Sequence, residues 1–128
     1  MKVFIVCAHP EPTSYNGAMF RIAQETLREA GHEVRVSDLY AMNFNPVPGF
    51  HDVSAPLGHD VFQMQPEQGN AAENGTFAAD ISVEQEKLYW ADLVIFQFPL
   101  WWFGLPGILK GWFDRVFAFG WAYRRQER

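Results

Sequence analysis

The sequence predicts an α/β fold in which helices cover a parallel β-sheet. Two apolar runs carry this prediction, Val3–Ala8 and Leu93–Phe98. Near-continuous apolar runs are typical of parallel strands that are covered on both faces. The order along the chain is strand, helix, strand, long loop, helix, strand and helix. This alternation favours right-handed crossovers between parallel strands.

The first strand ends in the segment His9–Asn16, and a helix with its apolar face on Met19, Ile22, Ala23, Leu27 and Ala30 follows. Thr13, Ser14 and Asn16 are suited to cap this helix, and Gly31 is suited to end it. The free amides and dipole of a helix start also attract anions. No glycine-rich phosphate motif occurs here, so hydroxyl and amide side chains would bind a phosphate. Simple helix capping is the alternative interpretation.

The next strand is expected over residues 33–39, with Val34, Val36 and Leu39 directed inward. Residues 40–80 are rich in Pro, Gly, Asn and Asp and show no sustained periodicity, which predicts a long loop. Two His-Asp pairs in it, at 51–52 and 59–60, favour a solvated loop over a metal site, and no metal is predicted.

A capping box at Ser82–Gln85 predicts a helix that leads into the third strand. Pro99 ends that strand because proline has no amide for the ladder. An aromatic loop follows, and Pro106 is suited to the first turn of the last helix. The apolar residues of this helix recur at helical spacing: Ile108, Leu109, Trp112, Phe113, Val116 and Phe117.

The aromatic loop Leu100–Phe103 is the first indication of a binding site. Ligands of open α/β sheets bind just beyond the carboxyl ends of the strands, which is where this loop stands. A loop rarely buries such large side chains alone, so a flat apolar ligand is expected on it. A hydrophobic contact between two subunits is the alternative.

The composition excludes several classes of protein. The 128 residues are enough for one domain, and a net charge of −5 with a pI near 5.2 argues against a nucleic-acid partner. No apolar run is long enough for a membrane span, and the apolar start is too short for a signal peptide, so a cytoplasmic location is expected. The single cysteine, Cys7, excludes an internal disulfide and is expected in the core.

Four motifs occur in order: AHPEPTSYN, SDLYAMNFNP, ADLVIFQFPLWWFGLPGILKGWFDRVF and FGWAY. These motifs cover most of the chain to about Tyr123. Through them the sequence resembles the NAD(P)H:quinone oxidoreductase (DT-diaphorase-like) family of flavodoxin-fold flavoproteins. The resemblance implies a flavodoxin-like three-layer α/β fold. It also implies FAD, rather than FMN, at a homodimer interface. The implied reaction is a two-electron hydride transfer from NAD(P)H through the flavin to a quinone.

The resemblance also implies roles for individual residues. It places Trp102, Phe103 and Tyr123 around the quinone. Arg115, beside Asp114, is expected to be a surface or interface charge. The implied cofactor-binding residues are His9, Thr13, Ser14, Tyr15, Asn16, Gln63, Pro99, Leu100, Trp101, Trp102, Phe103 and Asp114.

The sequence departs from this family at its carboxyl end. A complete flavodoxin-like sheet has about five strands in the order 2-1-3-4-5, whereas only the 2-1-3 part is found in this sequence. Residues 1–128 are therefore expected to form an incomplete flavin-binding domain. The family's catalytic tyrosine and histidine would lie beyond Arg128, so no catalytic residue is assigned.

An exposed apolar edge on the third strand is expected as a result, and with it a chain that is marginally stable alone or dimerises. Two other functions fit the same fold. One is an ancillary flavoprotein of a potassium-efflux system, and the other is a non-catalytic fragment or interaction module.

Overall fold

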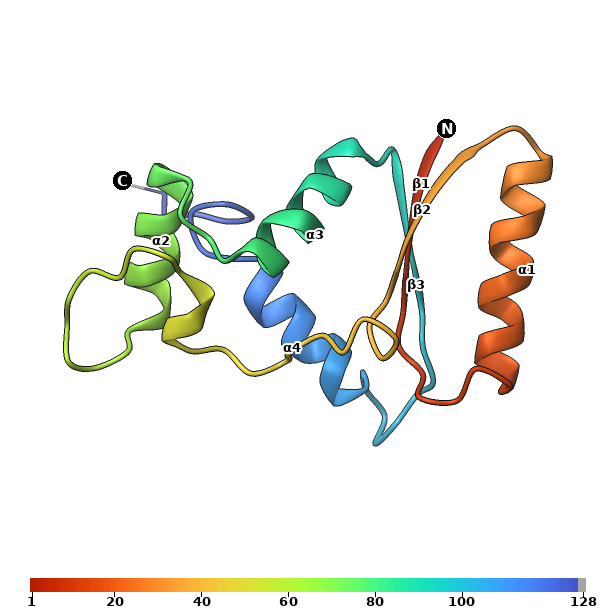
Figure 1. The fold of residues 1–128 in the computed structure, drawn as a ribbon, viewed down its shortest axis with the longest axis horizontal. Helices are drawn as coiled ribbons and strands as arrows, with labels where there is room; N and C mark the ends of the chain where they lie inside the picture. The colour runs from red at the N-terminus through yellow and green to blue at the C-terminus, as the bar shows by residue number, and fades with distance from the viewer. Residues whose placement is uncertain (127–128) are drawn as a thin grey trace.

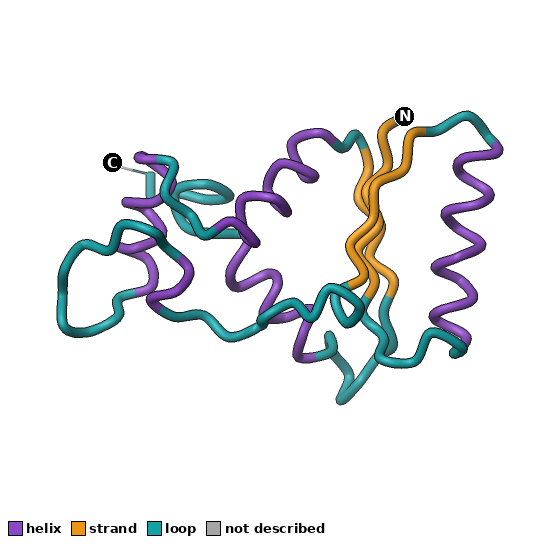
Figure 2. The backbone as a smooth tube through the Cα atoms, in the orientation of Figure 1, coloured by secondary structure: helices purple, strands orange, loops and turns teal. Residues whose placement is uncertain are grey.

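A computed structural model describes residues 1–126 and shows a small parallel sheet between two helical layers (Figure 1). Helix α1 covers one face of the sheet, and helices α3 and α4 cover the other (Figure 2). In chain order the elements are β1 (Lys2–Cys7), α1 (Tyr15–Glu29), β2 (Glu33–Asp38), the short 3-10 helix η1 (Phe50–Asp52), α2 (Met64–Asn74), α3 (Ala79–Trp90), β3 (Leu93–Gln97) and α4 (Gly107–Val116).

The sheet has the order β2-β1-β3 with both pairings parallel, which confirms the predicted 2-1-3 arrangement. Cys7, the last residue of β1, pairs with Asp38 of β2 and with Gln97 of β3. All three strands therefore end at one edge of the sheet, and the loops that follow them start side by side.

The central strand β1 supplies apolar residues to both faces, as the alternation of side chains in a strand requires. Phe4 and Val6 belong to the core beneath α3 and α4, together with Leu109 and the fully buried Trp112. The odd-numbered residues of β1 belong to the core beneath α1: Val3, Ile5 and Cys7. Val34 and Val36 also face α1, whereas Leu39, which follows β2, lies in the opposite core.

The prediction of one long loop over residues 40–80 is wrong, because η1 and α2 lie within it. The apolar periodicity of the sequence does not indicate helix α2, because two of its three buried residues, Glu67 and Gln68, are polar. Glu67 accepts a hydrogen bond from the Leu57 amide at 3.1 Å. Gln68 donates to the Asp114 carbonyl and accepts from the Phe119 amide. Polar contacts fix this helix, so its sequence shows no apolar stripe.

The capping box expected at Ser82 is also wrong, because α3 begins at Ala79, three residues earlier. Gln85, the residue of that box expected to turn back toward the helix start, is instead buried and donates to the Val116 carbonyl at 3.1 Å. Its neighbour Glu84 is fully buried. Its carboxylate accepts hydrogen bonds from Ser37 Oγ at 2.7 Å and from Trp112 Nε1 at 3.3 Å, and Lys87 Nζ lies 3.2 Å away. Glu84 therefore links β2, α3 and α4 across the core.

Arg115 is not the surface charge that the sequence suggested, since only 1% of it is exposed. Its guanidinium donates to Asp52 Oδ1 at 2.8 Å, to Asp80 Oδ2 at 2.6 Å and to the Asn45 carbonyl at 2.9 Å. Burial lowers the pKa of Arg115, but the carboxylates of Asp80 and Asp52 outweigh this and raise it. Asp52 is 2% exposed, so the expectation of a solvated loop is wrong there too.

We predict that Arg115→Met lowers the free energy of unfolding by about 3–5 kcal/mol, because it leaves the Asp52 carboxylate buried without its cation. The matched control is Lys110→Met, which removes an exposed pair with Asp114 on the same helix and should cost less than about 1 kcal/mol. Urea denaturation measures both variants. Equal losses in the two variants would show that the buried network does not support the fold.

Candidate functional site

The loop between β1 and α1 is held by hydrogen bonds within the segment His9–Gly17. His9 Nδ1 accepts the Glu11 amide at 3.0 Å and lies 3.0 Å from Ser14 Oγ. Ser14 is the N-cap of α1, and its Oγ accepts the Gly17 amide at 3.1 Å. The predicted capping role of Ser14 is thus confirmed. Because Nδ1 is engaged, Nε2 is the atom of His9 left for a ligand.

The start of α1 offers donors for an anion. Within residues 1–126, the main-chain amides of Tyr15 and Asn16 donate to no other residue. The Thr13 amide and hydroxyl both donate to Glu11 Oε1, at 2.9 and 2.7 Å. These two bonds lower the pKa of Glu11, the amide being the larger cause. A phosphate bound here would therefore lie beside the Glu11 carboxylate and compete with it for Thr13.

The loop between β3 and α4 displays its aromatic side chains to solvent. Trp102 is 95% exposed and Phe103 is 90% exposed. Both adopt the left-handed region, with φ of 48° and 57°, inside a turn that Trp101 and Gly104 close with two main-chain hydrogen bonds. Such strain in non-glycine residues costs about 1–3 kcal/mol each and concentrates at ligand sites. Exposed, strained aromatic side chains are typical of binding surfaces, so this loop is a candidate for one.

The two loops meet at the carboxyl ends of β1 and β3. The Ala8 amide donates to the Gln97 carbonyl at 2.9 Å, which extends the strand pairing beyond β1. The rings of His9 and Trp101 lie 6.1 Å apart between centroids. Gln97 Nε2 donates to Asn16 Oδ1 at 2.7 Å. The structure thus brings the predicted anion-binding segment and the predicted aromatic loop together.

Sequence reasoning missed Gln97, although it was visible as a polar residue that interrupts the apolar run Leu93–Phe98. A polar side chain at the end of an otherwise apolar strand is an indication that it has a specific partner. Here the partner is Asn16, which the sequence did single out.

Three predicted residues lie away from these loops. Gln63 is the N-cap of α2. Tyr123 packs on Phe119, with 5.5 Å between the centroids of the two rings. Figure 1 shows α2 and the carboxyl-terminal segment at the end of the molecule opposite α1. Asp114 is in the second half of α4 and pairs with Lys110 at 2.6 Å. Their roles remain predictions.

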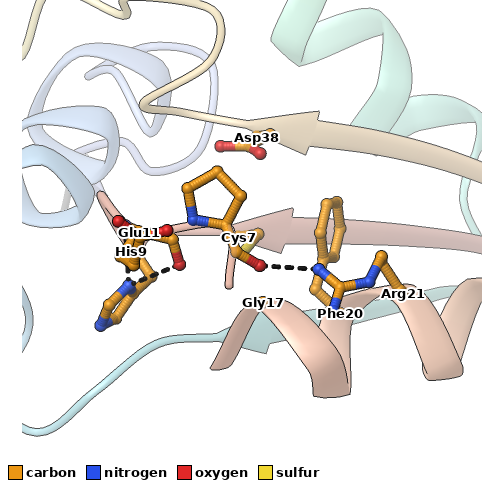
Figure 3. A pocket seen from close by; sticks show the side chains of 8 residues that line it. Cys7, His9, Glu11, Gly17, Phe20, Arg21 and Asp38 are labelled. Carbon is orange, nitrogen blue, oxygen red and sulfur yellow. Dashed lines mark hydrogen bonds between the residues drawn. The ribbon is translucent and has the colours of Figure 1, made fainter. Parts of the chain in front are cut away.

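A cavity of about 220 Å³ lies on the β2 side of the β1–α1 loop (Figure 3). Its volume is below the roughly 300–1,000 Å³ typical of ligand pockets, so the cavity is too small for a flavin ring. Arg21 Nη1 closes one side by donating to the Pro12 carbonyl at 2.6 Å. Burial, followed by the charge of Asp38, raises the pKa of Cys7 to about 11. The thiol is therefore protonated at neutral pH and is part of the core, as predicted.

No group of three or more His, Cys, Asp or Glu side chains among residues 1–126 is placed to hold a metal ion. None of the helices in that range is long and apolar enough to cross a bilayer.

The chain is similar to several known proteins. All 128 residues match the family described as having a flavodoxin-like fold. NAD(P)H dehydrogenase (quinone) 1 of Rattus norvegicus is 52% identical over 95% of this chain and 45% of the rat protein. Ribosyldihydronicotinamide dehydrogenase (quinone) of Mus musculus is 50% identical over 95% of this chain and 53% of the mouse protein. The chain spans about half the length of these curated relatives.

Solved structures agree with this similarity. A putative quinone reductase from Klebsiella pneumoniae superposes with a TM-score of 0.89 at 52% identity, over 92% of this chain and 46% of that one. An NAD(P)H:quinone oxidoreductase from Methanothermobacter marburgensis gives a TM-score of 0.71 at 35% identity, over 96% of this chain and 55% of that one. The three-strand core found here is therefore shared with both.

We predict that Gly17→Ala disturbs the β1–α1 loop, because a Cβ at position 17 would overlap the Pro12 carbonyl. The variant should lose about 1–3 kcal/mol of stability, the usual effect of overpacking. Gly107→Ala is the control, since a Cβ at that first position of α4 meets no atom within 4 Å. Thermal unfolding by circular dichroism compares the two. A Gly17→Ala protein as stable as the control would mean that the loop has room to yield.

Proposed function

The chain belongs to the flavodoxin-like fold family, and from this premise we propose that it binds FAD and transfers electrons from NAD(P)H to quinones. One observation carries the proposal: anion donors at the start of α1 and strained, exposed aromatics after β3 lie together at one edge of the sheet. Relatives named as quinone dehydrogenases support the choice of reaction.

The pyrophosphate of FAD fits the donors of the β1–α1 loop. We assign it to the amides of Tyr15 and Asn16, the Asn16 side chain and His9 Nε2, with Ser14 holding the loop as the N-cap. The amides stand at the positive end of the α1 dipole, which favours a bound anion. The Thr13 hydroxyl would also donate to the pyrophosphate once its hydrogen bond to Glu11 is broken.

The isoalloxazine ring fits the segment Pro99–Phe103, whose main-chain amides would hydrogen-bond its edge. The Trp101 amide already donates to Gly104, whereas those of Trp102 and Phe103 donate to no other residue within 1–126. Leu100 and the aromatic side chains would bury their exposed apolar surface on the ring. When bound, FAD would supply the two-electron chemistry between NAD(P)H and quinone, which no side chain can provide.

A second copy of the chain would complete this site, and we propose a homodimer. Trp102 and Phe103 leave a large apolar surface in a single chain, and β3 pairs on only one side within the described residues. Tyr123 would wall the quinone site, opposite Trp102 and Phe103, from the second copy. Gln63 and Asp114 would reach the far end of the cofactor in the same way. A cytoplasmic location remains a prediction of the sequence.

The first test of the function is retention of FAD. We expect about one FAD per chain after desalting, and then NAD(P)H-dependent reduction of a quinone. Trp102→Ala should weaken FAD binding by about 0.5–1.5 kcal/mol, because an aromatic stacking partner of the flavin ring is lost. Tyr89→Ala is the control, since Tyr89 is also exposed (76%) but lies on α3. Failure to retain FAD would favour a non-catalytic interaction module instead, and FAD retained without quinone turnover would favour an ancillary flavoprotein.

The dimer is tested by Trp102→Ser combined with Phe103→Ser. Both side chains are almost fully exposed, so their loss should leave the folded monomer intact. The dimer of the double variant should dissociate at a higher protein concentration than the wild-type dimer, as measured by sedimentation velocity. A wild-type chain that sediments as a monodisperse monomer and unfolds cooperatively would contradict the proposed assembly.

A further inference from the structure

Gln97 is the residue that ties the two halves of the proposed site together. It ends β3 opposite Cys7, and its carbonyl accepts the Ala8 amide at 2.9 Å. Its side chain crosses to α1, where Nε2 donates to Asn16 Oδ1 at 2.7 Å and lies 4.0 Å from Met19 Sδ. Among residues 1–126, these are the side-chain hydrogen bonds that join β3 to α1. The residue is partly buried, so the bond to Asn16 is shielded from bulk water.

The bond to Gln97 decides which end of the Asn16 amide is left for a ligand. A primary amide has one oxygen that accepts and one nitrogen that donates. Gln97 uses the oxygen of Asn16, so the nitrogen remains as the free end, and it bonds to no other group in the described chain. Asn16 is in the first turn of α1, beside the main-chain amides of Tyr15 and Asn16 that are also free. The three donors point to the same kind of ligand, an anion.

We propose that Gln97 is a positioning residue for the anionic part of the ligand, and that it acts through Asn16. By donating to Asn16 Oδ1, it keeps Asn16 Nδ2 available as a donor to a phosphate group. Gln97 itself is not assigned any contact with the ligand. The inference rests on the proposed function where the anion is the pyrophosphate of FAD.

The decisive variant is Gln97→Glu, which keeps the size of the side chain but replaces the donor with an acceptor. Asn16 would then turn its nitrogen toward residue 97 and present its oxygen to the phosphate. We expect binding of FAD and of inorganic pyrophosphate to weaken about 10- to 100-fold, the effect of losing a hydrogen bond to a charged group. Riboflavin, which carries no phosphate, should bind within about twofold of the wild type, because its ring is held by the other loop.

Two further variants separate positioning from general damage. Gln97→Leu removes the donor without reversing it, so Asn16 is free to turn, and the loss of pyrophosphate affinity should be smaller than in Gln97→Glu. In a chain that already carries Asn16→Ala, Gln97→Glu should cause no further loss, since the residue through which it acts is gone. Gln24→Glu is the control for an added carboxylate. Gln24 lies in the middle of α1, where its side chain donates to the Phe20 carbonyl, so this variant should leave pyrophosphate binding unchanged.

The outcomes distinguish this inference from the proposed function. Equal loss of riboflavin and FAD in Gln97→Glu, unchanged FAD binding, or a further loss in the Asn16→Ala background would each overturn the role of Gln97. A wild-type chain that binds pyrophosphate but no flavin would refute the proposed function alone, and the pyrophosphate affinities would still decide the role of Gln97. A wild-type chain that binds neither would overturn both. Calorimetry measures the affinities for FAD, pyrophosphate and riboflavin, with the side-chain amide signal of Asn16 in nitrogen-15 NMR as the structural readout.

Discussion

The in-register parallel pairing of β1 with β3 is the constraint on which the site depends. Cys7 and Gln97 end their strands as partners, and the Ala8 amide carries the ladder one bond further. A shift of one residue would turn each side chain of a strand to the opposite face. That would take Phe96 out of the core it shares with Trp112 and Gln97 away from Asn16. Packing on both faces therefore fixes the register, and the register fixes the site.

Buried polar groups hold the remaining elements against this apolar centre. Arg115 joins α4 to η1 and to α3 through Asp52 and Asp80, and Glu84 joins α3 to β2 and to α4. A buried ion pair contributes little net stability compared with an apolar pair, but removal of one partner is costly. These groups therefore specify one arrangement of the long segment between β2 and β3. The aromatic loop, in contrast, has no such partners among residues 1–126, and its Trp102 and Phe103 side chains are exposed.

The sequence predicted those parts of the fold that depend on apolar periodicity. Strands β1 and β3, helices α1 and α4 and the 2-1-3 sheet all follow from the pattern of apolar residues, although only β1 is buried beyond its first residue, whereas β3 is half-buried. Helix α2 and the start of α3 were missed because polar residues fill their buried positions, with Glu67 and Glu84 as the clearest cases. Charge alone likewise suggested a surface position for Arg115, since its partners Asp52 and Asp80 are distant in sequence. Motifs singled out both loops of the site, but only the structure shows that Gln97 joins them.

Our central claim is that the β1–α1 loop and the aromatic loop act as a single binding site for FAD. Hydrogen–deuterium exchange of the purified chain, with and without FAD, tests this claim at both loops in one measurement. We expect slower exchange on FAD addition at the amides of residues 13–16 and of residues 100–103 together. Protection of only one of these segments, or protection confined to the far helix α2, would show that the two loops do not form one site.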